Sequence, residues 1–551
     1  MTEHCDAVVI GAGHNGLVAA AMLADAGWDV VVVEAAPAAG GAVRSARSVH
    51  PDFETDQFSA FYPMTAASPV IAALDLESHG LEWAHAPKVL AHVRSDAPSA
   101  VLWRDAERTA ADLDRLDPGD GAAWRALDAQ WARFGEPMLH ALLAPFPPVR
   151  AGVRLVGAAR SELWDLARMA VLPVRSLAAE RFAGDPAALL LAGNALHADV
   201  SLDAAPSALL GWLLVGLGQQ VGFPVPRGGA GRLADALVSR VAAAGGVVRL
   251  DEPVRSVVVE HGRAAAVTTD RGELRARRAV LAACDAELLY GGLLAADDLP
   301  PAFMARMRGF HRATGTVKVN WALSAPVPWS DDRAVGAGTV HIADGIDELT
   351  RTAAQLAGDQ LPADPFLLMG QMTTADPTRS PQGTESLWAY THVPQEAVAD
   401  AGGEIGVTGR LRGAGLEAFV ERMEDRVEAH APGFRATVLA REVQGPDDLE
   451  SANPSLVGGD ISGGTAQLHQ QLVFRPVPGL ARAETPVSGL FLASSSAHPG
   501  GSVHGACGAN AARAALAHDR ARRLGPRLAA GVVGAASIAG PVWATRRRRR
   551  R

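Results

Sequence analysis

Residues 7–44 read AVVIGAGHNGLVAAAMLADAGWDVVVVEAAPAAGGAVR, and this stretch decides the fold. Its apolar start predicts a short buried strand, the glycine-rich residues 11–16 predict a tight turn, and the Ala/Leu-rich residues 17–26 predict a helix. A run of valines at 30–33 predicts a second buried strand that ends at Glu34. A strand, a glycine turn, a helix, a strand and an acid in this order are typical of a nucleotide-binding unit.

The three glycines of the turn and the acid each have a chemical reason. Gly11 allows the turn, Gly13 lets the backbone approach a pyrophosphate, and Gly16 lets the helix pack closely on the strand. The helix N-terminus faces the phosphates, and Glu34 stands about 20 residues further on, where a carboxylate binds ribose hydroxyls. The alternative is a glycine-rich turn without function, which we disfavour because all five parts occur in order.

A second glycine pair, Gly40 and Gly41, follows at once and is itself followed by Arg44. A nicotinamide enzyme has no evident need for these residues, whereas a longer cofactor that is anchored at two places does. The segment therefore favours a longer, doubly anchored cofactor over a nicotinamide cofactor.

Length, composition and charge indicate a soluble globular protein. The 551-residue chain is long for one core, so two domains are expected, either interleaved or successive. Hydrophobic residues make up 48% of the chain and charged residues 20%. The formal net charge is -9 although six arginines stand at 546–551, so the remainder is more acidic still. This balance argues against nucleic acid as a partner of the main fold.

The cysteines and the N-terminus bear on the compartment. Cys5, Cys284 and Cys507 are far apart and lack paired metal spacing, which argues against a disulfide framework or a metal site and favours a reducing compartment. The first strand begins by residue 7, which leaves no room for a signal peptide. We expect a cytoplasmic protein.

The middle of the chain separates into two parts. Residues 76–222 are predicted to be mostly helical, either as ordinary core or as a lid or channel for an apolar substrate. A second nucleotide-like block begins with PRGGAGRL at 226–233 and continues into a helix through residue 243. Strands are then predicted at 247–250, at 254–259, in a hairpin of 267–270 with 273–275, and at 278–283.

Residues 301–475 change to an alternating pattern. In the segment 316–323, Val317, Val319, Trp321 and Leu323 alternate with Thr316, Lys318, Asn320 and Ala322. Strands of this period build an antiparallel sheet with one wet or cavity-lining face. Residues 366–372 and 386–392 repeat the pattern on either side of a turn-rich segment at 376–383, so this part is the expected substrate domain.

The chain closes with another strand, turn and helix. Residues 489–493 predict a buried strand, SSSAHPGGSVHG at 494–505 predicts a glycine-rich turn, and residues 506–517 predict a helix. A turn that leads into a helix start suits a phosphate or an electron-rich ring edge. One long cofactor between the first and last segments explains both turns.

Together these blocks resemble the flavoprotein family of phytoene desaturases, retinol saturases and phytoene-dehydrogenase-like oxidoreductases. The resemblance covers residues 1 to about 520, and its last motif is the most specific. The residues that carry it are Gly11-x-Gly13-x-x-Gly16 with Glu34, Gly40-Gly41-x-x-Arg44, Pro226-Arg227-Gly228-Gly229, Asn453-Pro454, Gly458-Gly459-Asp460, Arg475-Pro476 and His498-Pro499-Gly500-Gly501.

The resemblance implies that the cofactor is FAD. By it, the first glycine turn holds the pyrophosphate, Glu34 the adenosine ribose, and Arg44 the region near the phosphates or the flavin. The remaining cofactor residues that the resemblance implies are Gly40, Gly41, Val254 against the adenine, Ser495, and Gly500, Gly501 and Val503 under the flavin ring. Relatives usually have glycine near Ser494, and many amine-oxidase-like relatives have an acid at Ser495, so this chain departs from the pattern there.

The resemblance also implies hydride transfer between a carbon framework and the flavin. His498 is the candidate for a catalytic group near the reacting edge, and its alternative role is to shape the turn before Pro499. His197 and Asp199 are further candidates, with a surface or capping role as the alternative. No Ser/His/Asp or paired-carboxylate arrangement that would favour hydrolysis is evident.

The leading hypothesis is an FAD-dependent desaturase or saturase of a hydrophobic, polyene or isoprenoid-like substrate such as a carotenoid precursor. An amine-oxidase-type flavoenzyme is the first alternative, although three tyrosines make an aromatic cage difficult to build. A flavin-binding regulatory protein without turnover is the second.

The expected fold is α/β, with a discontinuous Rossmann-like FAD-binding domain and an α+β substrate domain made of an antiparallel sheet and a helical lid. The apolar segment 528–544 and the arginines after it form a tail that either contacts an anionic membrane or stays solvated. The expected parts are residues 1–75, 223–300 and 481–522 for FAD, 76–222 for the helical region, 301–480 for the sheet and 523–551 for the tail.

Overall fold

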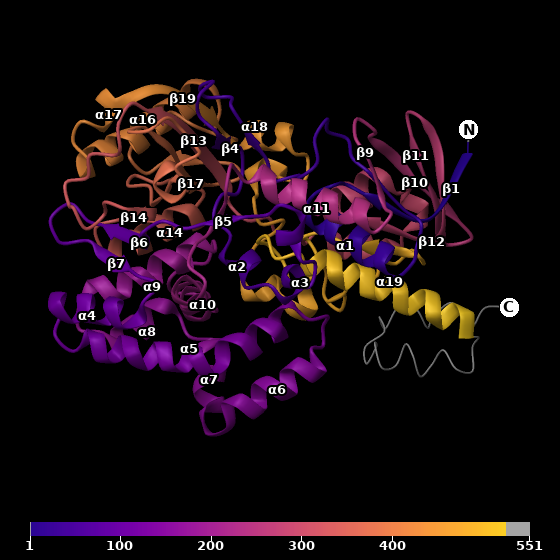
Figure 1. Cartoon of the computed structure of the whole chain (residues 1–551), viewed down its shortest axis with the longest axis horizontal. Coiled ribbons are helices and arrows are strands. Elements are labelled where there is room, and N and C mark those ends of the chain that lie inside the picture. Colours follow the sequence, from indigo (N-terminus) through magenta and orange to yellow (C-terminus); the bar gives the residue numbers. More distant parts are fainter. Residues whose placement is uncertain (1, 525–551) are drawn as a thin grey trace.

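The computed structural model describes residues 2–524. Figure 1 shows two lobes side by side, with both ends of the described chain in the same lobe. Within residues 2–524, no helix has both the length and the apolar character needed to cross a bilayer.

The first lobe is built on a seven-stranded sheet in which the beginning, middle and end of the chain meet. Its order is β10-β11-β12-β1-β2-β9, and β20 pairs with β12. The contacts of β1 with β2 and β12, of β2 with β9 and of β12 with β20 are all parallel. The strands are β1 (Thr2–Ile10), β2 (Val30–Val33), β9 (Val247–Arg249), β10 (Val254–Glu260), β11 (Arg263–Thr269), β12 (Gly272–Ala282) and β20 (Leu490–Leu492).

Helices from opposite ends of the chain lie side by side in this lobe. The helix α19 packs along α1, which also contacts α11 (Figure 1). Small residues make the close contact possible, because alanine and glycine fill most of the shared face of α1 and α19. The helices here are α1 (His14–Asp25), α2 (Pro63–Ala66), α3 (Pro69–Ala72), α11 (Gly231–Ala243), α12 (Ala286–Leu288), α13 (Pro301–Met307) and α19 (Ala506–Leu524).

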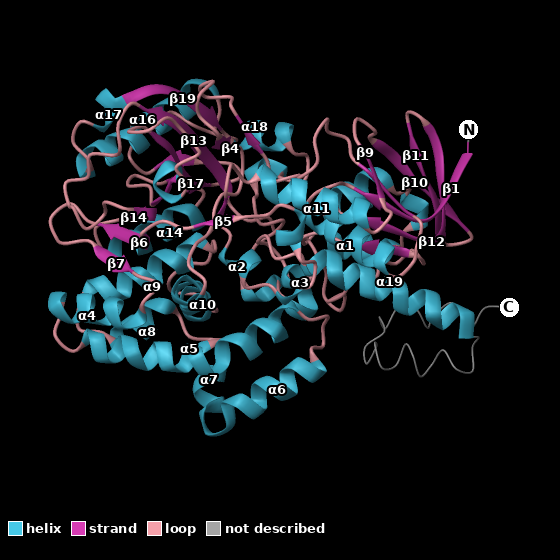
Figure 2. Ribbon diagram, in the orientation of Figure 1, coloured by secondary structure: helices cyan, strands magenta, loops and turns pink. Residues whose placement is uncertain are grey.

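The second lobe holds another seven-stranded sheet, of order β19-β13-β17-β16-β14-β6-β7 (Figure 2). All of its pairs are antiparallel except β14 with β6. The strands are β6 (Lys88–Val93), β7 (Ala100–Leu102), β13 (Gly315–Leu323), β14 (Ala337–Ile342), β16 (Leu367–Gln371), β17 (Glu385–Val393) and β19 (Val438–Gln444). Its helices are α14 (Ile346–Ala357), α15 (Met372–Ala375), α16 (Gly413–His430), α17 (Phe434–Thr437) and α18 (Pro446–Ala452).

The two faces of this second sheet differ. Apolar side chains of β13, among them Val319 and Trp321, pack with α16 in one core. The opposite face carries Thr316, Lys318 and Asn320, yet all nine residues of β13 are buried. The expectation was a wet or cavity-lining face. The wet alternative is wrong for β13, because Lys318 on this face contacts the carbonyl groups of Asp56 and Phe58 and the helical layer lies against the sheet. The cavity-lining alternative stays a prediction.

A helical layer lies against the covered face of the second sheet. It consists of α4 (Ala106–Leu116), α5 (Asp120–Leu143), α6 (Val149–Ala159), α7 (Leu163–Met169), α8 (Val174–Arg181), α9 (Asp185–His197) and α10 (Ser207–Gln220). Three two-stranded pairs complete the fold: β3 (Ser45–Ala46) with β4 (Thr55–Asp56), β5 (Trp83–Ala84) with β8 (Val225–Pro226), and β15 (Gln360–Leu361) with β18 (Ala399–Asp400).

Three predictions of local structure need correction. The interpretation of residues 76–222 as helical is right for most of 106–220 but wrong for the strands β5, β6 and β7, since β6 pairs with β14, far along the sequence. The predicted strands 273–275 and 278–283 form one continuous strand, β12, because β1 pairs with nearly its whole length. The last helix also continues beyond residue 517, to Leu524.

Candidate functional site: a dinucleotide cradle at the meeting point of the chain ends

The first glycine turn connects β1 directly to α1. Gly11 has a φ of +93°, and a Cβ added at Gly16 would come within 2.1 Å of the Gly11 carbonyl oxygen. The helix therefore starts closer to the strand than any larger residue would allow. Gly13, the residue before α1, provides no side-chain cap, and the first turn of α1 has no acid. The backbone N–H groups at this helix start are thus suited to an anion.

Glu34 lies over this turn. Its carboxylate accepts hydrogen bonds from the backbone N–H of Ala12 (2.6 Å) and of Ala36 (2.9 Å). The remaining lone pairs of the half-buried carboxylate can accept from ribose hydroxyls. The segment before Val254 lies alongside, because the Glu252 N–H donates to the Glu34 carbonyl oxygen (2.8 Å). The structure therefore brings the strand expected at the adenine next to the acid expected at the ribose.

The second glycine pair lies directly on the first turn. Gly40 forms a bridge with Gly13 and donates its N–H to the Ala12 carbonyl oxygen at 2.8 Å. A Cβ added at Gly41 would come within 3.0 Å of the Gly13 Cα atom. These glycines, which are separated in sequence, thus pack backbone against backbone at one place.

Two buried nitrogen atoms at this place have no hydrogen-bond partner in the described part of the chain: Arg44 Nε and His14 Nε2. The Arg44 guanidinium lies 5.0 Å from the centre of the Phe58 ring and donates through Nη2 to the Ala452 carbonyl oxygen. Burial lowers the pKa of Arg44, and the charge of Glu34 opposes this shift. Burial also lowers the pKa of His14 to about 4.

The turn between β20 and α19 completes the cradle from the other end of the chain. A Cβ added at Gly508 would come within 1.9 Å of the Asn15 carbonyl oxygen, so α19 begins in direct contact with α1. The Thr65 hydroxyl donates to the Val503 carbonyl oxygen, and the Ser68 hydroxyl donates to that of His504 at 2.7 Å. The predicted flavin-side residues therefore lie between the start of α1 and the short helices α2 and α3.

The Arg475 side chain holds the turn between β20 and α19 in place. It is fully buried and donates to the carbonyl oxygens of Ser495 (2.9 Å), Thr465 (2.9 Å) and Gly463 (2.7 Å). A Cβ added at Gly500 would lie 3.5 Å from its guanidinium carbon. A Cβ at Gly501 would lie 2.9 Å from the Ser462 carbonyl oxygen, so the 462–465 segment packs against the turn. The sequence motif contained Arg475, but this supporting role was not predicted.

His498 contacts the helical layer. Its Nε2 lies 3.1 Å from the Ala144 carbonyl oxygen, and its ring meets Phe146 edge to face. Because a carbonyl only accepts, Nε2 carries the proton and Nδ1 is the acceptor atom. Burial lowers the pKa of His498 to about 4, so the ring is neutral at neutral pH. This bond ties the turn to the end of α5, and the catalytic role of His498 stays a prediction.

Lys318 is a functional candidate that the sequence interpretation missed. It is one of only two lysines in the chain and is buried on the covered face of β13. Its Nζ donates to the carbonyl oxygens of Asp56 and of Phe58, the residue under Arg44. Burial lowers its pKa to about 8. A rare lysine within a strand was the signal that could have found it.

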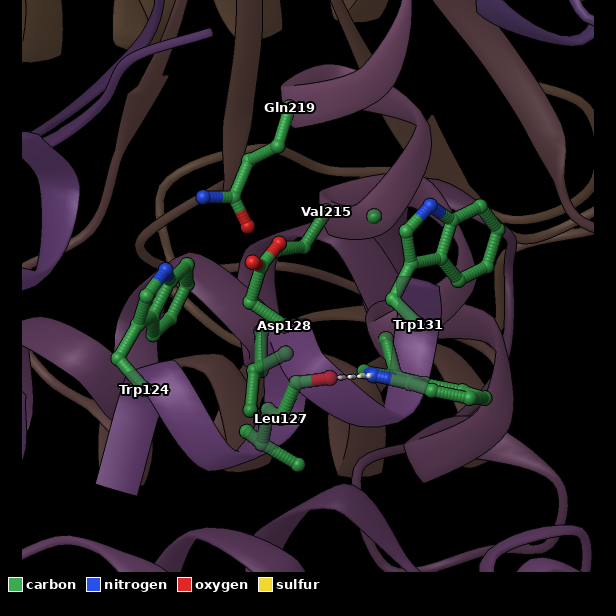
Figure 3. Close-up of a pocket in the computed structure, with 9 residues that line it drawn as sticks. Trp124, Leu127, Asp128, Trp131, Val215 and Gln219 are labelled. Carbon is green, nitrogen blue, oxygen red and sulfur yellow. Dashed lines mark hydrogen bonds between the residues drawn. The ribbon is translucent and has the colours of Figure 1, made fainter. Parts of the chain in front are cut away.

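A small pocket in the helical layer contains none of the predicted site residues. Figure 3 shows it between α5 and α10, with Trp124, Asp128 and Gln219 around it. The Trp212 indole donates to the Leu127 carbonyl oxygen beside it (3.1 Å). Glycine 216 makes room for Trp131, since a Cβ there would come within 2.2 Å of the ring. We regard this pocket as a gap in helix packing.

The residues fit a flavin dinucleotide. Glycine backbone, an uncapped helix start, a fixed carboxylate and two unpartnered buried donors or acceptors all face the same place. Among the described residues, no group of three or more His, Cys, Asp or Glu side chains is placed to hold a metal ion.

Comparison with known proteins agrees with this site. Residues 16–397 match the family of flavin containing amine oxidoreductases. The match covers more than half of the chain, and the protein belongs to this family. Its cofactor is FAD.

Relatives match along nearly their whole length. The pyridine nucleotide-disulfide oxidoreductase domain-containing protein 2 of Mus musculus is 28% identical, over 92% of this chain and 92% of the relative. A limonene dehydrogenase subunit of Castellaniella defragrans is 22% identical, over 93% and 94%. The neurosporene-forming phytoene desaturase of Cereibacter sphaeroides is 24% identical, over 94% and 96%.

Solved structures share the fold. An oxidoreductase from Methanosarcina mazei superimposes with a TM-score of 0.59 at 15% identity, over 94% of this chain and all of that one. A variant of putrescine oxidase gives a TM-score of 0.56 at 15% identity, over 97% of this chain and 100% of that one. The expected fold class, an α/β FAD-binding fold with a second mixed domain, is confirmed.

Proposed function

We propose that this flavoprotein oxidises or reduces a hydrophobic, polyene or isoprenoid-like substrate, as a desaturase or saturase. The observation that carries the proposal is a set of partly accessible apolar side chains on the core that also contains Ala493 and Ala506, the residues on either side of the flavin turn. All of them keep accessible surface. Phe61 precedes α2 and Met64 lies in it, Leu209 and Leu214 lie in α10, Tyr390 lies in β17, and Val503 lies in the turn itself.

The chemistry divides between the cofactor and the chain. Bound FAD supplies a donor or acceptor for hydride. The glycine turns and Glu34 hold the dinucleotide, and the bond of His498 to Ala144 holds the turn against the helical layer. The apolar side chains exclude water and orient a carbon chain, which is what reaction at an unactivated carbon requires. The names of two relatives, a limonene dehydrogenase subunit and a phytoene desaturase, support a terpenoid substrate, including a carotenoid precursor.

An amine oxidase is the second candidate, which the family favours. Against it, two of the three tyrosines are used elsewhere. The Tyr62 hydroxyl bonds Ser59, and Tyr290 packs on Phe303 in another core. Of the three tyrosines, Tyr390 is thus the one that lies among the apolar side chains, where it stacks on Trp388.

Anaerobic bleaching of the bound flavin tests the proposal. Purified holoprotein is mixed without oxygen with isoprenoid, straight-chain and amine substrates. The same mixtures are repeated after chemical reduction of the flavin, which tests the saturase direction. Bleaching, or reoxidation, by an isoprenoid supports the proposal. Bleaching by amines alone favours the amine oxidase, and no spectral change with any compound favours a flavin-binding regulatory protein.

We propose a cytoplasmic location with peripheral contact to an anionic membrane. The tail assigned to this contact, apart from residues 523 and 524, lies outside the described residues. Within the described part, α6 supports the proposal. It exposes Val149, Val153 and Val156 beside the exposed Arg150 and Arg154, a combination suited to anionic lipid. The next helix exposes 82% of Trp164, a residue that favours bilayer interfaces.

A further inference from the structure

Five polar residues form a connected group at one end of the covered sheet face. Thr314 precedes β13 and donates both its N–H (3.2 Å) and its hydroxyl (2.8 Å) to the carboxylate of Asp199, which follows α9. The same hydroxyl lies 2.9 Å from His392 Nδ1 on β17. Tyr390 meets the rings of both His392 (5.7 Å) and His197 (6.1 Å) edge to face.

The hydrogen bonds decide which nitrogen carries the proton in the neutral His392 ring. The Thr314 hydroxyl has one proton, and the carboxylate of Asp199 can only accept it. The hydroxyl must therefore accept from His392, so Nδ1 carries the ring proton and Nε2 presents a lone pair in the neutral ring. This Nε2 is buried and has no partner among the described residues, and His392 is only 4% exposed. An unmet acceptor in this position calls for a donor from outside the chain.

The group is connected to the apolar side chains, because Tyr390 belongs to both and the Phe61 ring lies 6.1 Å from Trp388, on which Tyr390 stacks. Tyr390 and His197 lie deep in the protein, yet both keep accessible surface. Within residues 2–524 no hydrogen bond is recorded for the Tyr390 hydroxyl, and His197 Nδ1 has no partner. The Tyr390 ring stacks on Trp388 at 5.9 Å, and Lys318 Nζ lies 5.8 Å from the Trp388 ring.

The group also lies next to the loop that supports the flavin turn. The Ala313 N–H donates to the carboxylate of Asp460 (3.2 Å), just before the 462–465 segment held by Arg475. A continuous path of contacts therefore connects the flavin turn, through the 462–465 segment, to the polar group with the unpaired His392 Nε2. A substrate chamber for pure hydrocarbons gains nothing from such groups, because unpaired buried polar atoms are costly.

We propose that His392, Tyr390 and His197 bind a hydroxyl group of the substrate, so that the substrate is an isoprenoid-like alcohol or a similar amphiphile rather than a hydrocarbon. The substrate hydroxyl donates to His392 Nε2, and the Tyr390 hydroxyl completes its hydrogen bonding. This inference rests on the proposed function, since it names the substrate class of the same chamber.

Matched pairs of ligands test the inference on the intact holoprotein. Geranylgeraniol, hexadecanol and cholesterol are each compared with the hydrocarbon in which hydrogen replaces the hydroxyl. Titration of the flavin absorption spectrum without oxygen gives an apparent dissociation constant for each compound. We expect at least one alcohol to bind about tenfold or more tightly than its hydrocarbon, the order of effect of one buried hydrogen bond.

Two substitutions separate recognition from folding. In His392→Asn the amide nitrogen replaces Nδ1 as the donor to Thr314, while the Nε2 acceptor is lost. We expect the preference for the alcohol to disappear, with the affinity for the hydrocarbon unchanged. His392→Gln places an acceptor near the Nε2 position and should restore part of the preference. His261→Asn, at an exposed turn, is the matched control.

The outcomes distinguish this inference from the proposed function. Equal affinities within all three pairs, or a preference that survives in His392→Asn, would overturn the hydroxyl site even if an isoprenoid bleaches the flavin. A preference that depends on His392 without any change in flavin oxidation state would keep the site and reject the oxidoreductase function. Failure of every compound to bind would reject both.

Discussion

The imidazole Nε2 of His498 lies 3.1 Å from the carbonyl oxygen of Ala144, so the flavin turn is bonded to the residue that follows α5. Two residues in sequence regions more than 350 positions apart thus share one hydrogen bond. The contact makes the position of α5 and the shape of the turn depend on each other.

Substitutions at His498 separate positioning from proton transfer. In His498→Gln the amide nitrogen can keep the bond to Ala144 but cannot exchange a proton, and we expect flavin reduction to keep most of its rate. In His498→Phe the bond is lost, and we expect about 1 kcal/mol less stability and faster hydrogen exchange at the end of α5. Stopped-flow absorbance and hydrogen exchange measure both effects. If His498→Gln instead loses nearly all of its flavin reduction rate although the bond to Ala144 is kept, His498 is catalytic.

Glu34 should govern FAD retention. Replacing it by glutamine removes one charged acceptor from the turn, so we expect FAD to bind tenfold to a hundredfold more weakly, as for loss of a hydrogen bond to a charged group. Fluorescence of FAD released by dialysis measures the change. Glu77→Gln, on the surface, is the control and should hold FAD normally. Equal retention in both variants would contradict the assignment of Glu34 to the ribose.

The contact between α1 and α19 should not tolerate a methyl group. In Gly508→Ala the new Cβ would meet the Asn15 carbonyl oxygen at 1.9 Å, so we expect a loss of about 1–3 kcal/mol and weaker FAD binding. In the control Gly152→Ala, the Cβ has open space inside α6, and we expect a gain of about 0.5–1 kcal/mol. Urea unfolding measures both. Similar effects of the two substitutions would argue against close helix packing at this end.

Lys318 should make stability depend on pH in the alkaline range. Its pKa is about 8 in the folded protein, against an ordinary value of 10.5. Between these values the unfolded chain binds more protons than the folded protein, so the free energy of unfolding should rise with pH. Subtracting the same measurement on Lys318→Met isolates this contribution. A wild-type curve parallel to that of the variant from pH 8 to 10 would show that the lysine titrates normally.

Membrane contact can be divided between the tail and α6. We compare the full chain, a chain truncated after Arg522, and Trp164→Ser in each, by co-sedimentation with vesicles of anionic or zwitterionic lipid. We expect binding to anionic vesicles to fall with either change and most when both are made, because Trp164 is exposed and the tail is rich in arginine. Equal binding by all four proteins would remove the membrane proposal. If the protein instead forms a dimer and does not bind vesicles, the exposed face of α6 contacts a second copy of the chain.

Local sequence signals were enough for the nucleotide-binding half of the fold. The turn at 11–16 and Glu34 obey rules of short range, because glycine is required where the backbone turns or closely approaches another segment. The same holds for the closing strand and the start of α19. Each of these elements can be predicted from a short run of consecutive residues.

Contacts between distant segments were not visible in the sequence. The strand β6 is a short apolar run that becomes part of a sheet only through β14, which follows it by about 250 residues. Arg475 and Lys318 look like ordinary charged residues until the carbonyl groups they serve are brought together. The polar group around Tyr390 likewise joins α9, the start of β13 and β17, three parts that no single motif connects.

The position of β20 and α19 at the end of the described chain sets a condition on cofactor loading in the cell. A ribosome-bound chain that lacks residues 490–524 has the first glycine turn but lacks β20, α19 and the turn between them. Flavin capture must therefore wait until β20 and α19 have been synthesised, and a chain terminated before them would remain colourless. The bound cofactor thus reports that translation has passed these two elements.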